Sequence, residues 1–236
     1  MLLLGGKEYV GIMHLHGAVS SETLEKTIKS FTGKITQLPP VRSNVKRALR
    51  EREVFYLDIL EVMDKDVLFK TGVQSGTYIR KLVHDIGQTL GTGAHMSELR
   101  RTKVCSLKES DRLVTLQDID DAVFYYVNEN DGKFLNYCVQ NIESAIDFMP
   151  KVFLSDYAVD TICHGSPVAV PGIVKFNDFS KNEKIALFSL KGELVAIGDS
   201  IVESQNLYGM EKGIVVKTDS VVMPIGTYPK YEREKV

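Results

Sequence analysis

Apolar residues recur at helical spacing most clearly between residues 79 and 90. The positions concerned are Ile79, Leu82, Val83, Ile86 and Leu90. Gly91-Thr92-Gly93 follows them and predicts the end of a helix. Ser75 or Thr77 is expected to cap its start, because the first backbone N–H groups of a helix lack acceptors. The pattern therefore predicts an amphipathic helix over residues 79–90.

The rest of the first half mixes helical and extended patterns. A short helical period runs through Leu24 and Ile28, and residues 118–126 predict another helix. One face of that second helix carries Ile119, Val123 and Tyr126. Extended, β-rich runs lie at residues 7–16, 54–60, 67–70 and 102–107. Mixed strands and helices of this kind predict an α+β domain.

The pattern of apolar and turn-forming residues changes near Met149. A brief helix begins at Ser155 and ends at Gly165, and short β-rich runs separated by glycines follow it. These runs lie at residues 168–170, 184–190, 194–197, 214–217 and 221–223. Short strands at close spacing predict a small β-barrel. We expect domains at residues 1–149 and 150–229, then a charged tail at 230–236.

Composition excludes several classes of protein. With 29 basic and 31 acidic residues the formal net charge is -2, so the chain is not basic overall, although local basic clusters can still bind RNA. Cys105, Cys138 and Cys163 are isolated, which indicates neither a disulfide framework nor a zinc site. No apolar run approaches the length of a membrane span. We expect a soluble, cytoplasmic protein.

Arg80 is the first candidate functional residue. It falls in the first turn of the predicted helix, where the helix dipole favours anions and gives an arginine no stabilisation. A forked guanidinium at this point indicates a carboxylate or phosphate partner held by two hydrogen bonds. An ordinary surface arginine is the alternative, and this segment alone does not separate the two.

Three segments in a fixed order resemble the TruB/dyskerin family of RNA pseudouridine synthases. They are KEYV at 7–10, SGTYIR at 75–80 and GTGAHMSELRRT at 91–102. The linker QLPPVRSNVKR at 37–47 resembles the archaeal and eukaryotic branch, whose members are catalytic subunits of H/ACA ribonucleoproteins. The resemblance covers nearly the whole chain, and the short linker and lack of a long basic tail favour an archaeal protein.

The resemblance implies an enzyme that detaches uracil from its ribose, rotates it and rejoins it through carbon, without metal or cofactor. The target base must leave its stack, so aromatic side chains must accept it. The resemblance implies that the Tyr9 ring packs against the flipped base. It also implies that Arg80 forms an ion pair with the catalytic aspartate. Tyr78 and Leu99 would line the pocket. The alternative for Tyr9 is a strand tyrosine that contributes only to packing.

The catalytic aspartate of the family is absent from this sequence. In the family it lies in a Gly-Thr-Leu-Asp-Pro segment ahead of the Lys-x-Tyr motif, which begins here at Lys7. Asp85, Asp118, Asp147 and Asp156 occur in unrelated contexts. We therefore expect this chain alone to be inactive and to need an upstream aspartate-containing segment, as a split gene, a start codon assigned too late or a deliberate fragment would each explain. The alternative is a non-catalytic RNA-binding scaffold; an unrelated metabolic enzyme is a weaker third.

Basic residues cluster in two regions expected to face RNA. The first comprises Arg42, Lys46, Arg47, Arg50 and Arg52, and the second comprises Arg100, Arg101 and Lys103, with Lys7 as a further RNA-binding candidate. Phosphate contacts from such residues make affinity depend on salt through counterion release. The alternative is that each cluster is simply a solvated face.

The second half resembles a PUA domain, a small RNA-binding barrel. The resemblance is carried by residues 158–165, 171–174, 190–198 and 226–229. Carried over by position, the RNA contacts would be His164, Gly165, Pro171 and Gly172. A glycine permits close approach of the backbone to RNA, although Gly165 has the alternative role of ending a helix.

The resemblance also implies partners. They are tRNA, or a guide RNA with rRNA, together with a small zinc-ribbon-like protein, a glycine- and arginine-rich-type protein and a kink-turn-binding ribosomal-like protein. His14 and His16 lie two residues apart and share a side of a strand, but no third metal ligand is apparent. No metal site is predicted.

Overall fold

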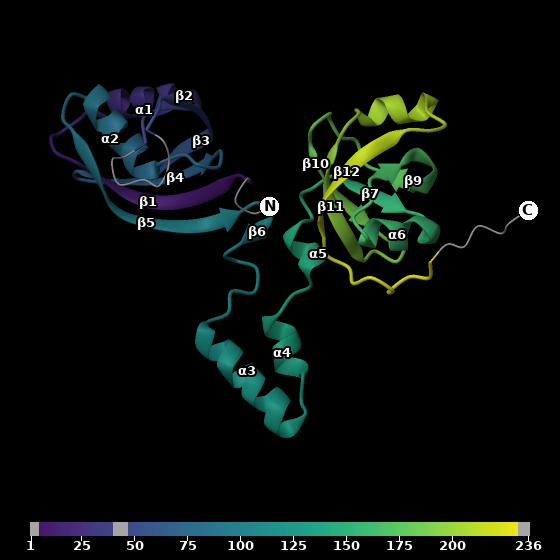
Figure 1. The fold of residues 1–236 in the computed structure, drawn as a ribbon. Coiled ribbons are helices and arrows are strands. Elements are labelled where there is room, and N and C mark those ends of the chain that lie inside the picture. The colour runs from purple at the N-terminus through teal and green to yellow at the C-terminus, as the bar shows by residue number, and fades with distance from the viewer. Residues whose placement is uncertain (1–4, 40–46, 231–236) are drawn as a thin grey trace, which may run out of the picture. The chain divides into compact units, whose positions relative to one another are not determined.

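The computed structural model describes residues 5–39 and 47–230. The chain forms two compact units, Met1–Cys138 and Val139–Val236, which are described separately (Figure 1). The boundary predicted near Met149 falls inside the second unit, just ahead of its strand β7 (Lys151–Leu154).

The first unit is built on an antiparallel sheet in the order β2-β3-β4-β1-β5-β6. The strands are β1 (Lys7–Leu15), β2 (Gly33–Gln37), β3 (Arg50–Met63), β4 (Asp66–Val73), β5 (Ala94–Val104) and β6 (Leu107–Lys108). The predicted strands near residues 7–16, 54–60 and 67–70 are confirmed. β5 begins eight residues before the predicted run at 102, because pairing with β1 extends it through a segment with no alternating apolar pattern.

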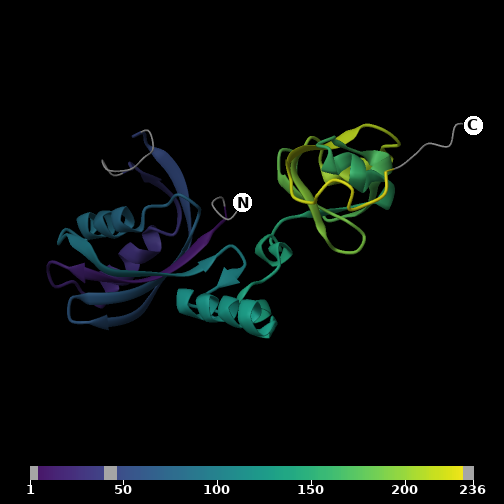
Figure 2. The same ribbon diagram turned by 60° about the horizontal axis from the view of Figure 1, so that its bottom comes forward.

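Helices α1 (Ser21–Ser30) and α2 (Ile79–Thr89) cover one face of this sheet (Figures 1 and 2). The core between them contains alternate β1 residues and the apolar stripes of both helices. Its most buried members include Met13, Leu15, Leu24, Ile28, Leu82, Val83 and Ile86. Both helices were predicted from this spacing.

The predicted cap of α2 is wrong. Its N-cap residue is Tyr78, and neither Ser75 nor Thr77 caps it with a side chain. The Thr77 hydroxyl instead donates a 2.7 Å hydrogen bond to the carbonyl of Gln74, within the preceding turn. The end of the helix is as expected, since Leu90 is the C-cap and Gly91 takes a positive φ of 75°.

The first unit continues into α3 (Leu116–Glu129) and α4 (Lys133–Cys138), which pack against each other (Figure 1). Thr115 and Asp118 form a reciprocal capping box at the start of α3. Asn130 ends the helix in the left-handed region. Local sequence therefore fixes both ends of α3.

The second unit begins with α5 (Ile142–Ala145) and contains a sheet in the order β8-β12-β11-β10-β7-β9. Its further strands are β8 (Val168–Ala169), β9 (Ile173–Phe176), β10 (Lys184–Phe188), β11 (Leu194–Ser200) and β12 (Ile214–Val221), with helix α6 (Asp156–Cys163) and short 3-10 turns at Val170–Gly172 and Ser204–Gly209. β12 contains the predicted run at 214–217 and ends at Val221, the first residue of the predicted run at 221–223. The predicted class, α+β with a small β-barrel as second unit, is confirmed. No helix in the described parts of the chain is long and apolar enough to cross a membrane.

A half-buried carboxylate ties four strands together on the face of the first sheet opposite α1 and α2. Glu8 on β1 accepts hydrogen bonds from Tyr56 on β3 and, at 2.7 Å, from Thr102 on β5. The ammonium group of Lys70 on β4 lies 3.1 Å from the same carboxylate. Burial opposes ionisation, but these contacts outweigh it and lower the pKa of Glu8 to about 2. Burial and the neighbouring carboxylate raise the pKa of Tyr56.

We predict that Glu8→Gln lowers the free energy of unfolding at pH 7 by about 2 kcal/mol, typical of hydrogen bonds to a charged group. The folded-state pKa is depressed from 4.5 to about 2, so the stabilisation is present above about pH 4.5 and lost as the pH falls towards 2. Urea titrations at several pH values would measure it. Glu98→Gln, at an exposed position of β5, is the control. A difference in unfolding free energy between the Glu8→Gln variant and the unsubstituted chain that does not shrink as the pH falls would contradict the prediction.

Candidate active site

The register between β1 and β5 brings the predicted site residues of these strands together. Tyr9 pairs with Arg101 and Gly11 pairs with Leu99, so Tyr9, Leu99 and Arg101 point to the same face of the sheet. The guanidinium carbon of Arg101 lies 5.6 Å from the centre of the Tyr9 ring. Tyr9 is 9% exposed and Leu99 is 40% exposed, so one side of the cluster is buried and the other is open.

Gly11 allows this arrangement. A Cβ at Gly11 would lie 2.8 Å from the carbonyl of Glu98 and 3.1 Å from Cδ1 of Leu99. Any larger residue would therefore collide with β5 or displace the Leu99 side chain. The glycine keeps space beside Tyr9 for Leu99.

Lys7 links the first two sequence motifs. Its ammonium group donates to the Ser75 hydroxyl at 3.2 Å and to the Gly5 carbonyl at 2.8 Å. Ser75 opens the SGTYIR segment, so this contact joins the start of β1 to the turn that leads into α2. The site therefore combines residues about seventy positions apart in the chain.

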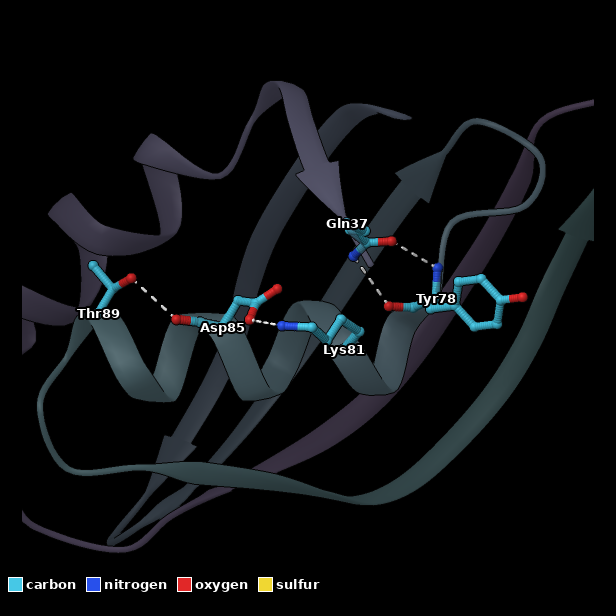
Figure 3. Close-up of polar contacts among 5 residues, drawn as sticks. All are labelled: Gln37, Tyr78, Lys81, Asp85 and Thr89. Atoms are coloured by element: carbon cyan, nitrogen blue, oxygen red, sulfur yellow. Dashed lines mark hydrogen bonds and ion pairs between the residues drawn. The ribbon is translucent and has the colours of Figure 1, made fainter. Parts of the chain in front are cut away.

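Gln37 fixes the start of α2. Its side-chain oxygen accepts from the Tyr78 N–H at 3.0 Å, and its amide nitrogen donates to the Tyr78 carbonyl at 3.2 Å (Figure 3). Gln37 is 2% exposed and ends strand β2. One buried amide thus satisfies both backbone groups of the N-cap residue and anchors the turn that presents Tyr78 and Arg80.

Arg80 is exposed at the second position of α2. Its side chain makes no hydrogen bond or ion pair with any residue that the structure describes. An arginine whose partner lies outside this chain would look like this, and so would an ordinary surface arginine. Its predicted position across a cavity from Tyr9 remains a prediction.

Arg52 lies next to the turn that leads into α2. The sequence pattern identified it only as a member of the first basic cluster. Its Nη1 donates to the Glu51 carbonyl at 2.7 Å, while its Nε is buried with no partner in the described residues. The guanidinium lies against Gly76, where a Cβ would come within 3.2 Å of Nε. Gly76 has a φ of 79°, and it leaves room for this arginine beneath the turn before α2.

The second predicted basic cluster is divided. Arg101 faces Tyr9, whereas Arg100 pairs with Val10 and points to the other face of the sheet. Glu109 holds the Arg100 guanidinium through both of its oxygens, with Nε 2.9 Å from Oε2. Successive strand residues point to opposite faces, so neighbours in sequence do not share a surface.

A hollow of about 520 Å³ adjoins these residues, lined mainly by Lys7, Arg101, Lys103, Val104, Leu107 and Lys108.

Two members of the first basic cluster, Arg42 and Lys46, lie outside the described residues. Arg47 is exposed and Arg50 is half-buried at the start of β3. The assignment of both clusters to RNA remains a prediction.

The predicted PUA contacts lie around α6 in the second unit. His164 is the C-cap of this helix, with Nδ1 2.8 Å from the Asp160 carbonyl oxygen. Gly165 follows with a φ of 86°, so it does end the helix. Pro171 and Gly172 lie in the 170–172 turn at the other end, where the Gly172 carbonyl accepts from Ser155 at 2.9 Å. α6, whose eight residues make it about 12 Å long, lies between the two pairs.

Three of the four histidines of the first unit, His14, His16 and His95, meet at one end of the sheet. His95 on β5 pairs with His14, and its Nδ1 lies 2.9 Å from Nε2 of His16. His14 also contacts Asp66 at 2.6 Å. Sequence spacing alone did not place His95 here. Within residues 5–39 and 47–230, no group of three or more His, Cys, Asp or Glu side chains is arranged to hold a metal ion.

Comparisons with known proteins match the chain throughout. Residues 5–111 match a model of the C-terminal region of Pus10, residues 80–147 match the tRNA pseudouridylate synthase B C-terminal domain, and residues 150–222 match the PUA domain. A probable tRNA pseudouridine synthase B from Pyrococcus horikoshii is 46% identical over 97% of this chain and 69% of its own length. A homologue from Methanopyrus kandleri is also 46% identical, over 97% and 68%.

The chain belongs to the TruB/Cbf5 family of pseudouridine synthases. This confirms the resemblance drawn from its three motifs. Solved members share its fold: a Cbf5-Nop10-Gar1 complex matches with a TM-score of 0.93 and 44% identity, over 97% of this chain and 70% of that one. An archaeal box H/ACA sRNP Nop10-Cbf5 complex matches at 0.88 and 41%, over 98% and 71%. About three tenths of these TruB/Cbf5 proteins therefore has no counterpart here.

We predict that Gln37→Leu destabilises this TruB/Cbf5 chain by about 1–3 kcal/mol, because it leaves the partly buried N–H of Tyr78 without an acceptor and leaves the Tyr78 carbonyl with only the Leu82 N–H as donor. Hydrogen exchange should accelerate in the first turn of α2 more than in its last turn. Gln88→Leu, on the exposed side of the same helix, is the matched control. Equal effects of the two substitutions on chemical denaturation and on exchange would show that Gln37 does not anchor the helix.

Proposed function

We propose that this chain supplies the base pocket and the RNA-binding surfaces of an RNA pseudouridine synthase. The reaction is the isomerisation of uridine to pseudouridine in tRNA, in rRNA selected by a guide RNA, or in both. Its catalytic aspartate comes from a segment outside these 236 residues. The observation that carries the proposal is the shared face of Tyr9, Leu99 and Arg101, tied through Lys7 and Ser75 to the turn before Tyr78 and Arg80.

Each pocket residue has a proposed role. The Tyr9 ring packs against the flipped uracil, and Tyr78 and Leu99 complete the walls. Arg80 pairs with the incoming aspartate, orients it and keeps it ionised, because an adjacent guanidinium favours the charged carboxylate. The exposure of Arg80 leaves it accessible to that partner. Arg101 holds the Tyr9 ring from the open side.

RNA binding extends beyond the pocket in this proposal. Lys7 and Arg101 contact the backbone near the target, and Arg100 contacts it from the opposite face of the sheet. Arg42, Lys46 and Arg47 contact it from the linker before β3, and Arg50 contacts it from the first position of β3. The PUA domain at 150–229 grips RNA through His164, Gly165, Pro171 and Gly172, and the division from a catalytic portion at 1–149 is part of the proposal. Because α6 separates the two pairs, they would contact different nucleotides.

The proposed partners are H/ACA guide RNA, its substrate RNA and the core proteins of the ribonucleoprotein, in a cytoplasmic setting. Two solved relatives support this: one is a complex with Nop10 and Gar1, and another is an H/ACA RNP bound to a substrate RNA. Both are more than 40% identical to this chain.

A non-catalytic scaffold is the second candidate. The observation that favours it is the absence of a Gly-Thr-Leu-Asp-Pro segment from the 236 residues. A scaffold would bind RNA but would form no pseudouridine, even when the aspartate-containing segment of a relative is supplied.

We predict that Tyr9→Leu and Arg80→Gln each reduce single-turnover pseudouridine formation at least a hundred-fold when the chain is co-expressed with that segment. Each substitution removes a group that acts on the reacting base or on the aspartate, a loss typical of such groups. Tyr208→Leu and Arg112→Gln, at exposed positions, are controls. RNA affinity should change little. Activity of either variant close to that of the unsubstituted chain would contradict the assigned role, and RNA binding with no activity in any variant would favour the scaffold.

We predict that reversing the charge at Arg47 and Arg50 weakens RNA binding and flattens its salt dependence. Losing two phosphate contacts should reduce the slope of log K against log salt by about 1.4 to 1.8. Fluorescence anisotropy between low and moderate salt would measure the slope. Glu substitutions at Lys26 and Lys29 on α1 change the net charge equally and should leave the slope unaltered. Unchanged affinity and slope in the Arg47/Arg50 variant would refute the linker contact.

A further inference from the structure

Arg52 on β3 packs against the turn at residues 74–78, which connects β4 to α2. A Cβ at Gly76, in the middle of this turn, would lie 3.2 Å from Nε and 3.3 Å from Nη2 of Arg52. Gly76 has a φ of 79°, a conformation that residues other than glycine rarely adopt. The guanidinium therefore lies directly against a stretch of backbone that glycine is best suited to supply.

Two other strands hold the same turn on either side of Gly76. The Lys7 ammonium group on β1 donates to the Ser75 hydroxyl at 3.2 Å. The Gln37 side chain on β2 bonds both the N–H and the carbonyl of Tyr78 (Figure 3). Successive parts of the turn are thus supported by three different strands, and Arg52 supports the middle part.

Strand pairing fixes the face from which Arg52 reaches the turn. Arg52 lies opposite Ile35 on β2, and Gln37 is two residues further along that strand, so all three project to the same face of the sheet. Val54, two residues after Arg52, is buried in the core on that face. This is the face that α2 covers, so Arg52 reaches the start of the helix from the sheet beneath it.

Packing alone does not account for an arginine at this position. Nη1 donates to the Glu51 carbonyl at 2.7 Å, while Nε is buried and finds no hydrogen-bond partner in the part of the chain that the structure describes. A buried donor without an acceptor costs free energy. An apolar side chain of similar length would fill the same space without that cost, so the guanidinium itself is the feature that needs a role.

We propose that Arg52 is a positioning residue of the proposed base pocket. Its planar guanidinium fixes the turn at Gly76 and, through that turn, the placement of Tyr78 and Arg80, without itself contacting RNA. This role rests on the proposed function, and it differs from the sequence-based expectation that Arg52 faces RNA with the rest of the first basic cluster.

The first measurement uses the 236-residue chain alone and does not depend on activity. Arg52→Met keeps the length of the side chain and removes its planar head. Hydrogen exchange should become about ten-fold faster at the Thr77 amide, which donates to the Gln74 carbonyl within the turn, and should stay unchanged at Leu90, at the far end of α2. Lys34→Met, at an exposed position of β2, is the matched control. Equal exchange at Thr77 in the two variants would overturn the inference.

The second measurement uses the chain co-expressed with the aspartate-containing segment of a relative, and it separates turnover from RNA affinity. Single-turnover pseudouridine formation at saturating RNA should fall about twenty-fold in Arg52→Met, while the dissociation constant and its salt slope stay unchanged. Arg52→Lys should be equally slow, because it keeps the charge but not the planar head. In an Arg80→Gln background, either substitution should slow the reaction by less than about three-fold, because residues that act through one another are not additive. Circular dichroism checks that each variant keeps the fold.

Two further results would overturn the positioning role. One is weaker RNA binding by Arg52→Met with a salt slope reduced by about 0.7 to 0.9, which indicates a lost phosphate contact. The other is full activity of Arg52→Lys, which would show that the charge alone suffices. An active complex whose rate is unaffected by Arg52→Met contradicts only this inference. An unsubstituted complex that forms no pseudouridine contradicts the proposed function, while exchange at Thr77 in the free chain still decides whether Arg52 supports the turn.

Discussion

The register of β1 against β5 is the constraint on which the site depends. A β-bulge between Glu8 and Tyr9 shifts the pairing, so that Glu8 lies opposite Lys103 but Tyr9 lies opposite Arg101. Without that shift Tyr9 would pair with Thr102, and Arg101 would face the other side of the sheet. Bulges commonly re-aim side chains in this way near functional sites. Here Thr102 is the extra residue of the bulge. Its hydroxyl donates to Glu8, and Arg101 lies beside the Tyr9 ring.

The two faces of the sheet consequently have different tasks. On one face, Glu8 joins four strands through an ionised carboxylate, which holds the register of β1 against its neighbours. On the other face, the helices bury the apolar core and α2 delivers the turn that contains Tyr78. Gln37 connects that turn to β2 through a buried amide. A fixed sheet and a fixed helix start together pre-organise the wall of the proposed pocket, as the proposed base flipping would require.

Sequence predicted those parts of the molecule that depend on local periodicity. The spacing of Ile79, Leu82 and Ile86 located α2, and the face of α3 was visible in Ile119, Val123 and Tyr126. Long-range effects were not visible. The cap of α2 was wrong because a glutamine from β2 replaces a local hydroxyl, and β5 was too short because its pairing partner, rather than its own pattern, makes it a strand.

The site shows the same division. Motif resemblance predicted Tyr9, Tyr78, Arg80 and Leu99 as pocket residues, and this stays a prediction. The charge pattern grouped Arg100 with Arg101, which strand alternation sends to opposite faces. Arg52 and Gln37 received no individual role, because only their three-dimensional neighbours reveal one.

The most direct measurement is a crystal structure of this chain bound to the aspartate-containing segment of a relative. The account predicts that the incoming carboxylate lies within ion-pair distance of the Arg80 guanidinium, about 4 Å, and that the Tyr9 ring borders the same cavity. A carboxylate bound elsewhere, with Arg80 still in solvent and Tyr9 closed off from it, would contradict the assignment of this face as the catalytic pocket.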